Sequence, residues 1–330
     1  MATVYVIDPL ERLMPYAIER DAALAAGADF VLGDAGAPRV RDAEVILTYL
    51  VPFDAAAIAG LSRCRGIIRC GVGVDSVDLA AATAAGIVVC NAPTYCVPDV
   101  ADHAASLILA GARRIAWFDG AVRRGAWQAA HDAERGMRRI AAQTIGIIGL
   151  GRIGRGVAQR LAPFGARLLG HDPYLGDDQI RAMGVTPLSL EDVLRQSDVV
   201  SLHVPLAPAT WHLIDAGRLA LMKPDATLVN TSRGPLVDTA ALVAALHAGR
   251  IFGAALDVLE DEPPGAAHPL YAFDPRRVLL TPHAAASSHE AQHDLHRELA
   301  ASIDALVRGR RPAAIVNREV VARSISPNAR

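Results

Sequence analysis

Residues 144–161 read TIGIIGLGRIGRGVAQRL, an apolar run that breaks into glycines at Gly149, Gly151 and Gly154 before a helix-like pattern resumes. Strand, glycine turn and helix in this order indicate a dinucleotide-binding unit. Gly151 would let a pyrophosphate approach the backbone, and the following helix N-terminus offers it unpaired N–H groups. The next expected strand ends at Asp172, whose carboxylate suits the ribose hydroxyls of NAD and would repel a 2′-phosphate. The stretch therefore predicts NAD as the cofactor.

Length and composition limit the kind of protein to which this unit belongs. The chain has 330 residues, enough for two domains, with 52% hydrophobic residues and a formal net charge of -2. Its arginines are interleaved with acidic residues, so we expect no nucleic acid partner. It has no signal-peptide pattern and no apolar segment of bilayer length, so we expect no membrane partner and a cytoplasmic location. The four cysteines lack CxxC spacing, which predicts buried reduced thiols and no bound metal.

Short apolar runs of strand length alternate with longer amphipathic runs along most of the chain. Six strands are expected from Thr144 onward, at 144–149, 166–172, 199–204, 227–232, 253–258 and 277–283. Five more are expected upstream of it, at 4–9, 29–33, 44–50, 65–71 and 86–93. Continuous apolar strands of this kind suit parallel sheets that helices cover on both faces. We predict an α/β protein with two doubly wound parallel-sheet domains. Helices are expected at 99–115 and 287–309, and the tail at 310–320 could return to the first domain.

Three chemically suited side chains follow three of the later strands. Arg233 follows the strand TLVNTS, Glu262 lies in the acidic segment after GAALDV, and His283 follows VLLTP. Ligands of such sheets bind outside the carboxyl ends of the strands, so these side chains could converge. Arg233 could hold a 2-keto acid by a two-pronged contact, while His283 protonates the carbonyl oxygen as hydride reaches carbon. A carboxylate at Glu262 would favour the protonated form of His283.

Blocks of sequence around these residues resemble the D-isomer-specific 2-hydroxyacid dehydrogenases. The blocks are VNTSRGPLVD, GAALDVLEDEPP and LLTPHAA, with RCGVGVDSVD and NAPTYCVPDVADHA upstream. The resemblance implies that Arg233, Glu262 and His283 are the catalytic trio, and that the backbone of Val72 and Gly73 in the glycine loop binds the substrate carboxylate. The expected cofactor contacts, besides the glycines and Asp172, are Arg152, Ile153, His203, Thr231 and Asp257.

The resemblance also implies a domain order that explains why the glycine motif begins so late. A Rossmann NAD domain, expected at 99–287, is inserted into a flavodoxin-like substrate domain made of 1–98 and 288–330. The active site would lie in the interdomain cleft, where closure excludes water. The family implies a homodimer formed through the cofactor domain. The expected reaction is the NAD-dependent interconversion of a small 2-keto acid and its D-2-hydroxy acid.

Substrate side-chain selectivity is expected to come partly from the loop after the strand EVIL, which contains Tyr49 and Leu50. This loop, Tyr49-Leu50-Val51-Pro52, has no lysine or arginine, so a phosphorylated substrate is disfavoured. The segments CVPDVADHA, RRIAWF and HDPYLGDD look most like the bacterial relatives of the carboxyl-terminal-binding-protein branch. That branch adds an alternative, an NADH-sensing corepressor-like scaffold with little turnover. A formate dehydrogenase is less favoured, because those relatives carry Gln at the position of Glu262.

A second motif leaves a zinc hydrolase as a formal alternative. Residues 289–293 read HEAQH, which matches HExxH, and His296 follows one turn later. Both histidines of the motif would lie on one helical face. No third ligand with suitable spacing is evident, so the dehydrogenase is preferred.

Overall fold

The chain folds into two compact units, each with its own parallel sheet. The computed structural model describes residues 1–10, 15–128 and 137–320. One unit consists of Met1–Cys96 with Ser287–Arg330, and the other of Val97–Ala286. The second unit thus begins two residues, and ends one residue, before the predicted boundaries. Helix α4 (Val97–Ala112) begins before Pro98 and not after it, because proline is tolerated in the first turn of a helix.

The first unit contains a five-stranded sheet in the order β2-β1-β3-β4-β5, with every pair parallel. This order is that of flavodoxin-like sheets, as predicted. The elements of this unit are β1 (Ala2–Val6), α1 (Ala17–Ala25), β2 (Ala28–Leu32), η2 (Pro38–Asp42), β3 (Val45–Thr48), α2 (Ala55–Ala59), β4 (Gly66–Arg69), α3 (Leu79–Ala84), β5 (Val88–Cys90) and α12 (His289–Val307).

Successive strand residues of the first unit enter two different cores, which explains why helices cover both faces of its sheet. Val4 packs with α1 and α12, whereas Tyr5 packs with α2 and α3. The same alternation holds in β3, where Leu47 belongs to the first core and Ile46 to the second. Both faces are therefore apolar, and the strands lack the alternation of apolar and polar residues that a half-exposed sheet shows.

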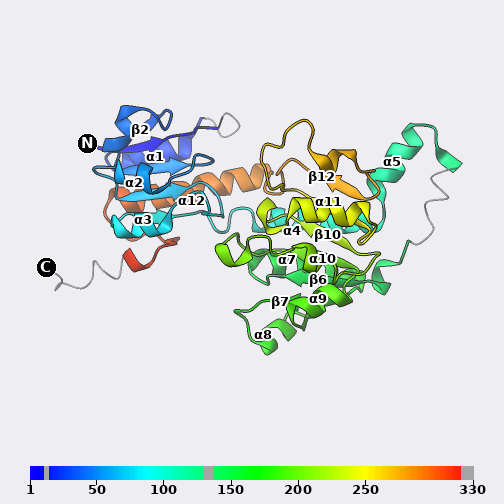
Figure 1. The fold of residues 1–330 in the computed structure, drawn as a ribbon. Helices are drawn as coiled ribbons and strands as arrows, with labels where there is room; N and C mark the ends of the chain where they lie inside the picture. The colour runs from blue at the N-terminus through cyan, green and yellow to red at the C-terminus, as the bar shows by residue number, and fades with distance from the viewer. Residues whose placement is uncertain (11–14, 129–136, 321–330) are drawn as a thin grey trace. The chain divides into compact units, whose positions relative to one another are not determined.

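The late segment 287–320 completes the first unit. Helix α12 packs along α1 and against β3 and β4, and Figure 1 shows it, in orange, among the blue elements of this unit. Beyond it, Ile315 pairs with Cys90 of β5. The side chain of Asn317 accepts a hydrogen bond from Val89 N at 2.7 Å and donates one to the carbonyl of Ile87 at 2.9 Å. The predicted return of the tail to the first domain is confirmed.

The second unit contains a seven-stranded parallel sheet in the order β12-β11-β10-β9-β6-β7-β8. Its centre follows the Rossmann pattern, with the strand order reversing at β6. Besides α4, its elements are α5 (Ile115–Arg123), η3 (Ile140–Ala142), β6 (Thr144–Ile148), α7 (Arg152–Leu161), η4 (Ala162–Phe164), β7 (Arg167–His171), α8 (Asp177–Arg181), β8 (Thr186–Pro187), α9 (Leu190–Gln196), β9 (Val199–Leu202), η5 (Pro208–Thr210), α10 (Ala216–Leu219), β10 (Thr227–Asn230), η6 (Gly234–Leu236), α11 (Thr239–His247), β11 (Gly253–Leu256), η7 (Pro269–Ala272) and β12 (Val278–Leu280).

Local sequence explains where many of these helices begin. Six helices are each preceded by an aspartate or serine whose side chain accepts a hydrogen bond from a backbone N–H of the first turn. These capping residues are Asp54, Asp78, Ser189, Asp215, Asp238 and Ser288. Each such cap stabilises its helix by about 1 kcal/mol. In the second unit, α4 and α7 share one core on one face of the sheet, and α9, α10 and α11 share another.

The prediction of buried thiols holds for three of the four cysteines. All four are free thiols, with Cys70, Cys90 and Cys96 buried and Cys64 half-buried. Burial raises the pKa of Cys64 and Cys90 to about 12, so both stay as unreactive thiols at neutral pH. Across the described ranges, no helix is both long and apolar enough to cross a membrane.

Candidate active site

The glycine turn between β6 and α7 has two glycines that packing requires and one that faces open space. Gly149 has φ of 89°, and a Cβ there would lie 2.7 Å from the carbonyl oxygen of His203. A Cβ on Gly154 would lie 2.0 Å from the carbonyl oxygen of Gly149. A Cβ on Gly151 would meet nothing within 4 Å, so this position leaves room for a ligand at the N-terminus of α7. Arg152 and Ile153 form the first turn of that helix.

Asp172 lies at the end of β7 and holds the glycine turn. One carboxylate oxygen accepts a hydrogen bond from Leu150 N at 2.9 Å, and the other accepts one from Tyr174 N at 3.0 Å. The half-buried carboxylate also lines a hollow of about 350 Å³ together with residues of β8 and the loop that follows, such as Leu188. The side chain is therefore fixed in place and still reachable by a ligand.

Two buried polar atoms near this turn lack a hydrogen-bond partner within the described part of the chain. They are Nδ1 of His203, which follows β9, and Oγ1 of Thr231, which follows β10. Burial lowers the pKa of His203 to about 4, so the ring is neutral at neutral pH, and its Nε2 lies 2.9 Å from Ser201 Oγ. Unpartnered polar atoms at the carboxyl ends of adjacent strands fit a polar ligand such as a dinucleotide.

The structure brings two of the three predicted catalytic side chains into direct contact. Nδ1 of His283 lies 2.6 Å from Oε2 of Glu262, whose Oε1 accepts a hydrogen bond from Leu259 N at 2.8 Å. Burial opposes ionisation of Glu262, but the hydrogen bond and charge of His283 outweigh it and lower the pKa of the carboxyl. The His283 side chain is 48% exposed. Because Nδ1 is held by Glu262, Nε2 is the ring atom that can exchange a proton with a substrate.

Arg233, the third residue of the trio, lies in a tight turn after β10. The buried side chain of Asn230 spans this turn, accepting from Ser232 N at 3.0 Å and donating to the Arg233 carbonyl at 2.7 Å. Arg233 Nη1 donates to the carbonyl of Ser232 at 2.8 Å. The positive charge of Arg233 is one of the causes that lower the pKa of Glu262, so all three side chains share one electrostatic environment.

A buried aspartate supports the backbone of His283. The Asp257 carbonyl accepts a hydrogen bond from His283 N at 2.7 Å, and the Asp257 carboxylate accepts from the N–H groups of Ala284 and Ala285, both at 2.9 Å. These contacts hold His283 at φ of 51°, a left-handed conformation that is uncommon for residues other than glycine. Asp257 was predicted as a cofactor contact; its carboxylate, 1% exposed, mainly holds this loop.

Thr281 and His103 extend this network and were not predicted from the sequence. His103 of α4 places Nε2 3.0 Å from Thr281 Oγ1 and 3.4 Å from Asp257 Oδ1, and Thr281 Oγ1 donates to Asp257. Burial would raise the pKa of Asp257, but these hydrogen bonds and those from the backbone lower it well below its ordinary value. The sequence signals were a hydroxyl two residues before His283 and a histidine on a helix whose buried residues are all apolar.

The predicted substrate-binding residues belong to the first unit, where they follow neighbouring strands. Tyr49 and Leu50 follow β3, and Val72 and Gly73 follow β4. Tyr49 is only 4% exposed and its ring packs on Tyr16, whereas Leu50 is 70% exposed. Of the two, Leu50 is therefore the side chain that a ligand could reach in this structure, and the contact of Tyr49 with substrate stays a prediction. In the ranges that the structure describes, the N–H groups of Val72 and Gly73 have no hydrogen-bond acceptor, as an anion-binding loop requires.

The HExxH motif lies on α12 without the surroundings of a metal centre. His293 is exposed, and His296 instead contacts the buried Glu19 of α1. Among the described residues, no three histidine, cysteine, aspartate or glutamate side chains gather closely enough to hold a metal ion. The motif thus belongs to a helix that packs in the first unit.

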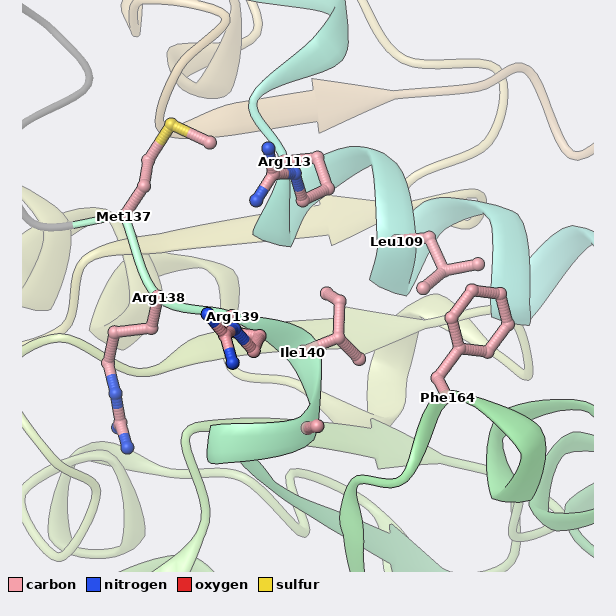
Figure 2. Close-up of a pocket in the computed structure, with 8 residues that line it drawn as sticks. Leu109, Arg113, Met137, Arg138, Arg139, Ile140 and Phe164 are labelled. Carbon is pink, nitrogen blue, oxygen red and sulfur yellow. The ribbon is translucent and has the colours of Figure 1, made fainter.

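Another hollow, of about 610 Å³, lies at the amino-terminal end of the seven-stranded sheet. Figure 2 shows Leu109, Ile140 and Phe164 gathered on one side of it, and the heads of Arg113 and Arg139 nearby. Arg138, at its rim, pairs with Asp198 at 2.9 Å just before β9. Because the chemistry of such sheets occurs at the carboxyl ends of the strands, this hollow is separate from the catalytic trio.

Comparison with known proteins adds independent information. Residues 105–285 match the description "D-isomer specific 2-hydroxyacid dehydrogenase, NAD binding domain". The chain is 41% identical to a glyoxylate reductase of Korarchaeum cryptofilum over 86% of this chain and 85% of that protein. It is 39% identical to a D-3-phosphoglycerate dehydrogenase of Mycobacterium bovis, over 86% of this chain but 51% of that protein. The D-lactate dehydrogenase of Aquifex aeolicus, solved with NAD and lactic acid, superposes with a TM-score of 0.85 at 28% identity, covering 96% of this chain and 99% of that one.

Proposed function

Because the chain belongs to the D-isomer-specific 2-hydroxyacid dehydrogenases, an NAD-binding family of oxidoreductases, we propose that it interconverts a small 2-keto acid and its D-2-hydroxy acid. The observation that carries the proposal is the 2.6 Å contact between His283 and Glu262 beside the charge of Arg233. An imidazole, a carboxylate and a guanidinium in this relation provide proton transfer and anion binding together. The relatives named glyoxylate reductase and D-lactate dehydrogenase support a small substrate.

In this proposal, each member of the trio has one task. His283 donates a proton from Nε2 to the carbonyl oxygen during reduction, and removes it during oxidation. Glu262 stabilises the protonated imidazole through Nδ1. Arg233 binds the carboxylate and orients the carbonyl, and the Val72 and Gly73 N–H groups bind the carboxylate as well. Bound NAD supplies the other half of the reaction by carrying the hydride.

The cofactor would be held by the second unit. We propose that the pyrophosphate lies over Gly151 and the N–H groups of Arg152 and Ile153, and that Asp172 accepts the ribose hydroxyls. The unpartnered atoms of His203 and Thr231 would then receive polar contacts from the cofactor. Asp257 would use its remaining acceptor capacity for the same ligand.

A panel of 2-keto acids tests the proposed function. Purified protein is mixed with either NADH or NADPH and with one 2-keto acid at a time: glyoxylate, hydroxypyruvate, pyruvate or 2-oxobutyrate. Oxidation of the cofactor is followed by its absorbance. We expect turnover of at least one acid, with NADH preferred because the Asp172 carboxylate repels a 2′-phosphate. A preference for NADPH would contradict the ribose assignment. Tight NADH binding without turnover of any acid would contradict the enzymatic proposal.

That last outcome would instead support the alternative of an NADH-sensing scaffold. The relatives found by comparison are named for dehydrogenases and reductases, and this does not favour a corepressor-like role. The same names do not support the predicted carboxyl-terminal-binding-protein branch, which stays a sequence-based prediction. The resemblance that suggested it rests on three short segments.

We further propose that the chain forms a homodimer through its NAD-binding unit. Ile115 and Val122 on α5 are 56% and 44% exposed, next to a small apolar cluster around Trp117 and Phe118. Exposed apolar side chains that gather in this way are typical of protein interfaces. Sedimentation equilibrium should give twice the mass of one chain, and Ile115→Asp should shift it toward the monomer. Leu24→Asp, at an equally exposed leucine of α1, should not; a monomeric wild type contradicts the proposal.

A further inference from the structure

Asp8, two residues after β1, accepts hydrogen bonds from the backbone of the predicted substrate-recognition loop at residues 49–52. The N–H groups of Tyr49, Leu50 and Val51 are consecutive, and all three donate to the Asp8 carboxylate. The N···O distances are 2.8 Å from Tyr49 to Oδ1, and 2.6 Å from Leu50 and 2.8 Å from Val51 to Oδ2. Successive N–H groups that converge in this way form a nest of the kind that binds anions. Here the anion is a side chain of the protein itself.

This internal contact fixes the direction of the loop. The Thr48 hydroxyl donates to the Val51 carbonyl at 2.9 Å, which closes the turn from the other side. The ring of Tyr49 lies in the core of the first unit, edge-on to Tyr16 with centroids 6.3 Å apart. With the backbone held on both sides of it, Leu50 projects its side chain outward, at 70% exposure. An apolar side chain so exposed on a loop held so firmly is suited to contacting a ligand.

The loop lies beside the open N–H groups of Val72 and Gly73. Strands β3 and β4 are parallel neighbours, so the segments that follow them leave the sheet at the same edge. Farther along, Phe53 N donates to the carbonyl of Ser76 at 2.7 Å, which ties the two segments together. The Val72 carbonyl accepts from the side chain of Asn91 at 2.7 Å, so the second segment is fixed on its far side too.

From this arrangement we propose that Asp8 is a positioning residue for substrate selectivity, acting by holding Leu50 beside the carboxylate-binding N–H groups of Val72 and Gly73. The substrate class that fits has an uncharged, compact side chain at C3, because the side chain presented is apolar and the nest next to it is already filled by a carboxylate. The inference rests on the proposed function, since it assigns a recognition role within the same site. Asp8 itself touches neither substrate nor cofactor.

Comparing two substrates separates positioning from mere support of the fold. Glyoxylate has no side chain beyond its aldehyde hydrogen, whereas 2-oxobutyrate carries an ethyl group that must pack against the loop. For Asp8→Ala we expect the ratio of kcat/KM between 2-oxobutyrate and glyoxylate to change by about tenfold, in the range of a methylene contact in an apolar pocket. The change should fall mainly on KM for 2-oxobutyrate, because the trio in the second unit is untouched. NADH affinity, measured by fluorescence titration, should stay the same.

Three further variants keep the test decisive if Asp8→Ala folds poorly. Asp8→Asn keeps one acceptor oxygen for the loop, so its ratio should lie between wild type and Asp8→Ala. Leu50→Ala should change the ratio in the same direction, and combining it with Asp8→Ala should add little, since both remove one contact. Asp29→Asn removes an exposed charge from β2 in the same unit and should leave the ratio unchanged.

The outcomes distinguish a failure of the proposed function from a failure of the role assigned to Asp8. If wild type turns over no 2-keto acid, the proposed function fails. If wild type is active but Asp8→Ala and Leu50→Ala lower kcat/KM for both substrates in parallel, Asp8 only supports the fold and the inference is overturned. Additive effects of the two substitutions would likewise contradict a shared action through Leu50.

Discussion

Replacing His283 with glutamine is expected to lower kcat by about 10³-fold, the contribution typical of a positioned acid or base. Glutamine can still hydrogen-bond to Glu262, but it has no proton to transfer near neutral pH. The affinity for NADH should not change, because the glycine turn and Asp172 follow other strands, β6 and β7. Stopped-flow or steady-state absorbance at saturating substrate measures the first quantity, and titration of NADH fluorescence measures the second.

A matched control shows whether the loss of activity is specific to His283. His247→Gln, at an exposed histidine at the end of α11, serves as the matched control and should behave as wild type. A glutamine variant that retains more than about a tenth of wild-type kcat would exclude His283 as the acid.

Replacing Arg233 with glutamine is expected to lower kcat/KM by about 10³-fold, since two charge-assisted hydrogen bonds to the substrate carboxylate and carbonyl are lost. Part of the loss should be a higher KM, because binding in the ground state is weakened as well. Arg233→Lys keeps the charge without the planar fork, so its activity should lie between those of glutamine and wild type.

Kinetics across substrate concentrations measure this effect. Arg195→Gln, on α9, removes an exposed arginine that pairs with Asp192 and should have no effect on kcat/KM. An Arg233→Gln variant with a normal KM for every acid that wild type reduces would show that the guanidinium does not bind the substrate. Circular dichroism of the variant checks that its overall secondary structure matches that of wild type.

The sequence was most informative where regular elements are long and apolar. All eleven expected strands are present in the structure, because continuous apolar runs between helical segments are typical of a buried parallel sheet. Strand β8 (Thr186–Pro187) was not expected, since two residues ending in proline carry no periodic signal. The short helices α8 and α10 carry a similarly weak signal, because helices of five and four residues are too short to show a clear period.

Within the site, residues at strand ends could be predicted and the residues that hold them could not. Arg233, Glu262 and His283 each follow an apolar strand, so the topology of a parallel sheet suggests their convergence. Asp8 lies about 40 positions before the loop residues that it contacts, and His103 lies 178 positions before Thr281. Because these partners are so far apart in the sequence, no local pattern reveals either contact. The same loop contacts decide that Tyr49 turns inward while Leu50 faces solvent, a choice that spacing alone left open.

The contact between His103 and Thr281 also bears on how the discontinuous first unit assembles. To that unit, the second is an internal loop of roughly 190 residues, yet His103 near its beginning lies 3.0 Å from Thr281 near its end. Once the second unit has folded, the contact joins its two ends, so the flexible chain between the two segments of the first unit becomes about tenfold shorter. Closing the shorter loop costs about 2 kcal/mol less chain entropy, which favours an order of folding in which the inserted unit forms first and the two outer segments of the chain join afterwards.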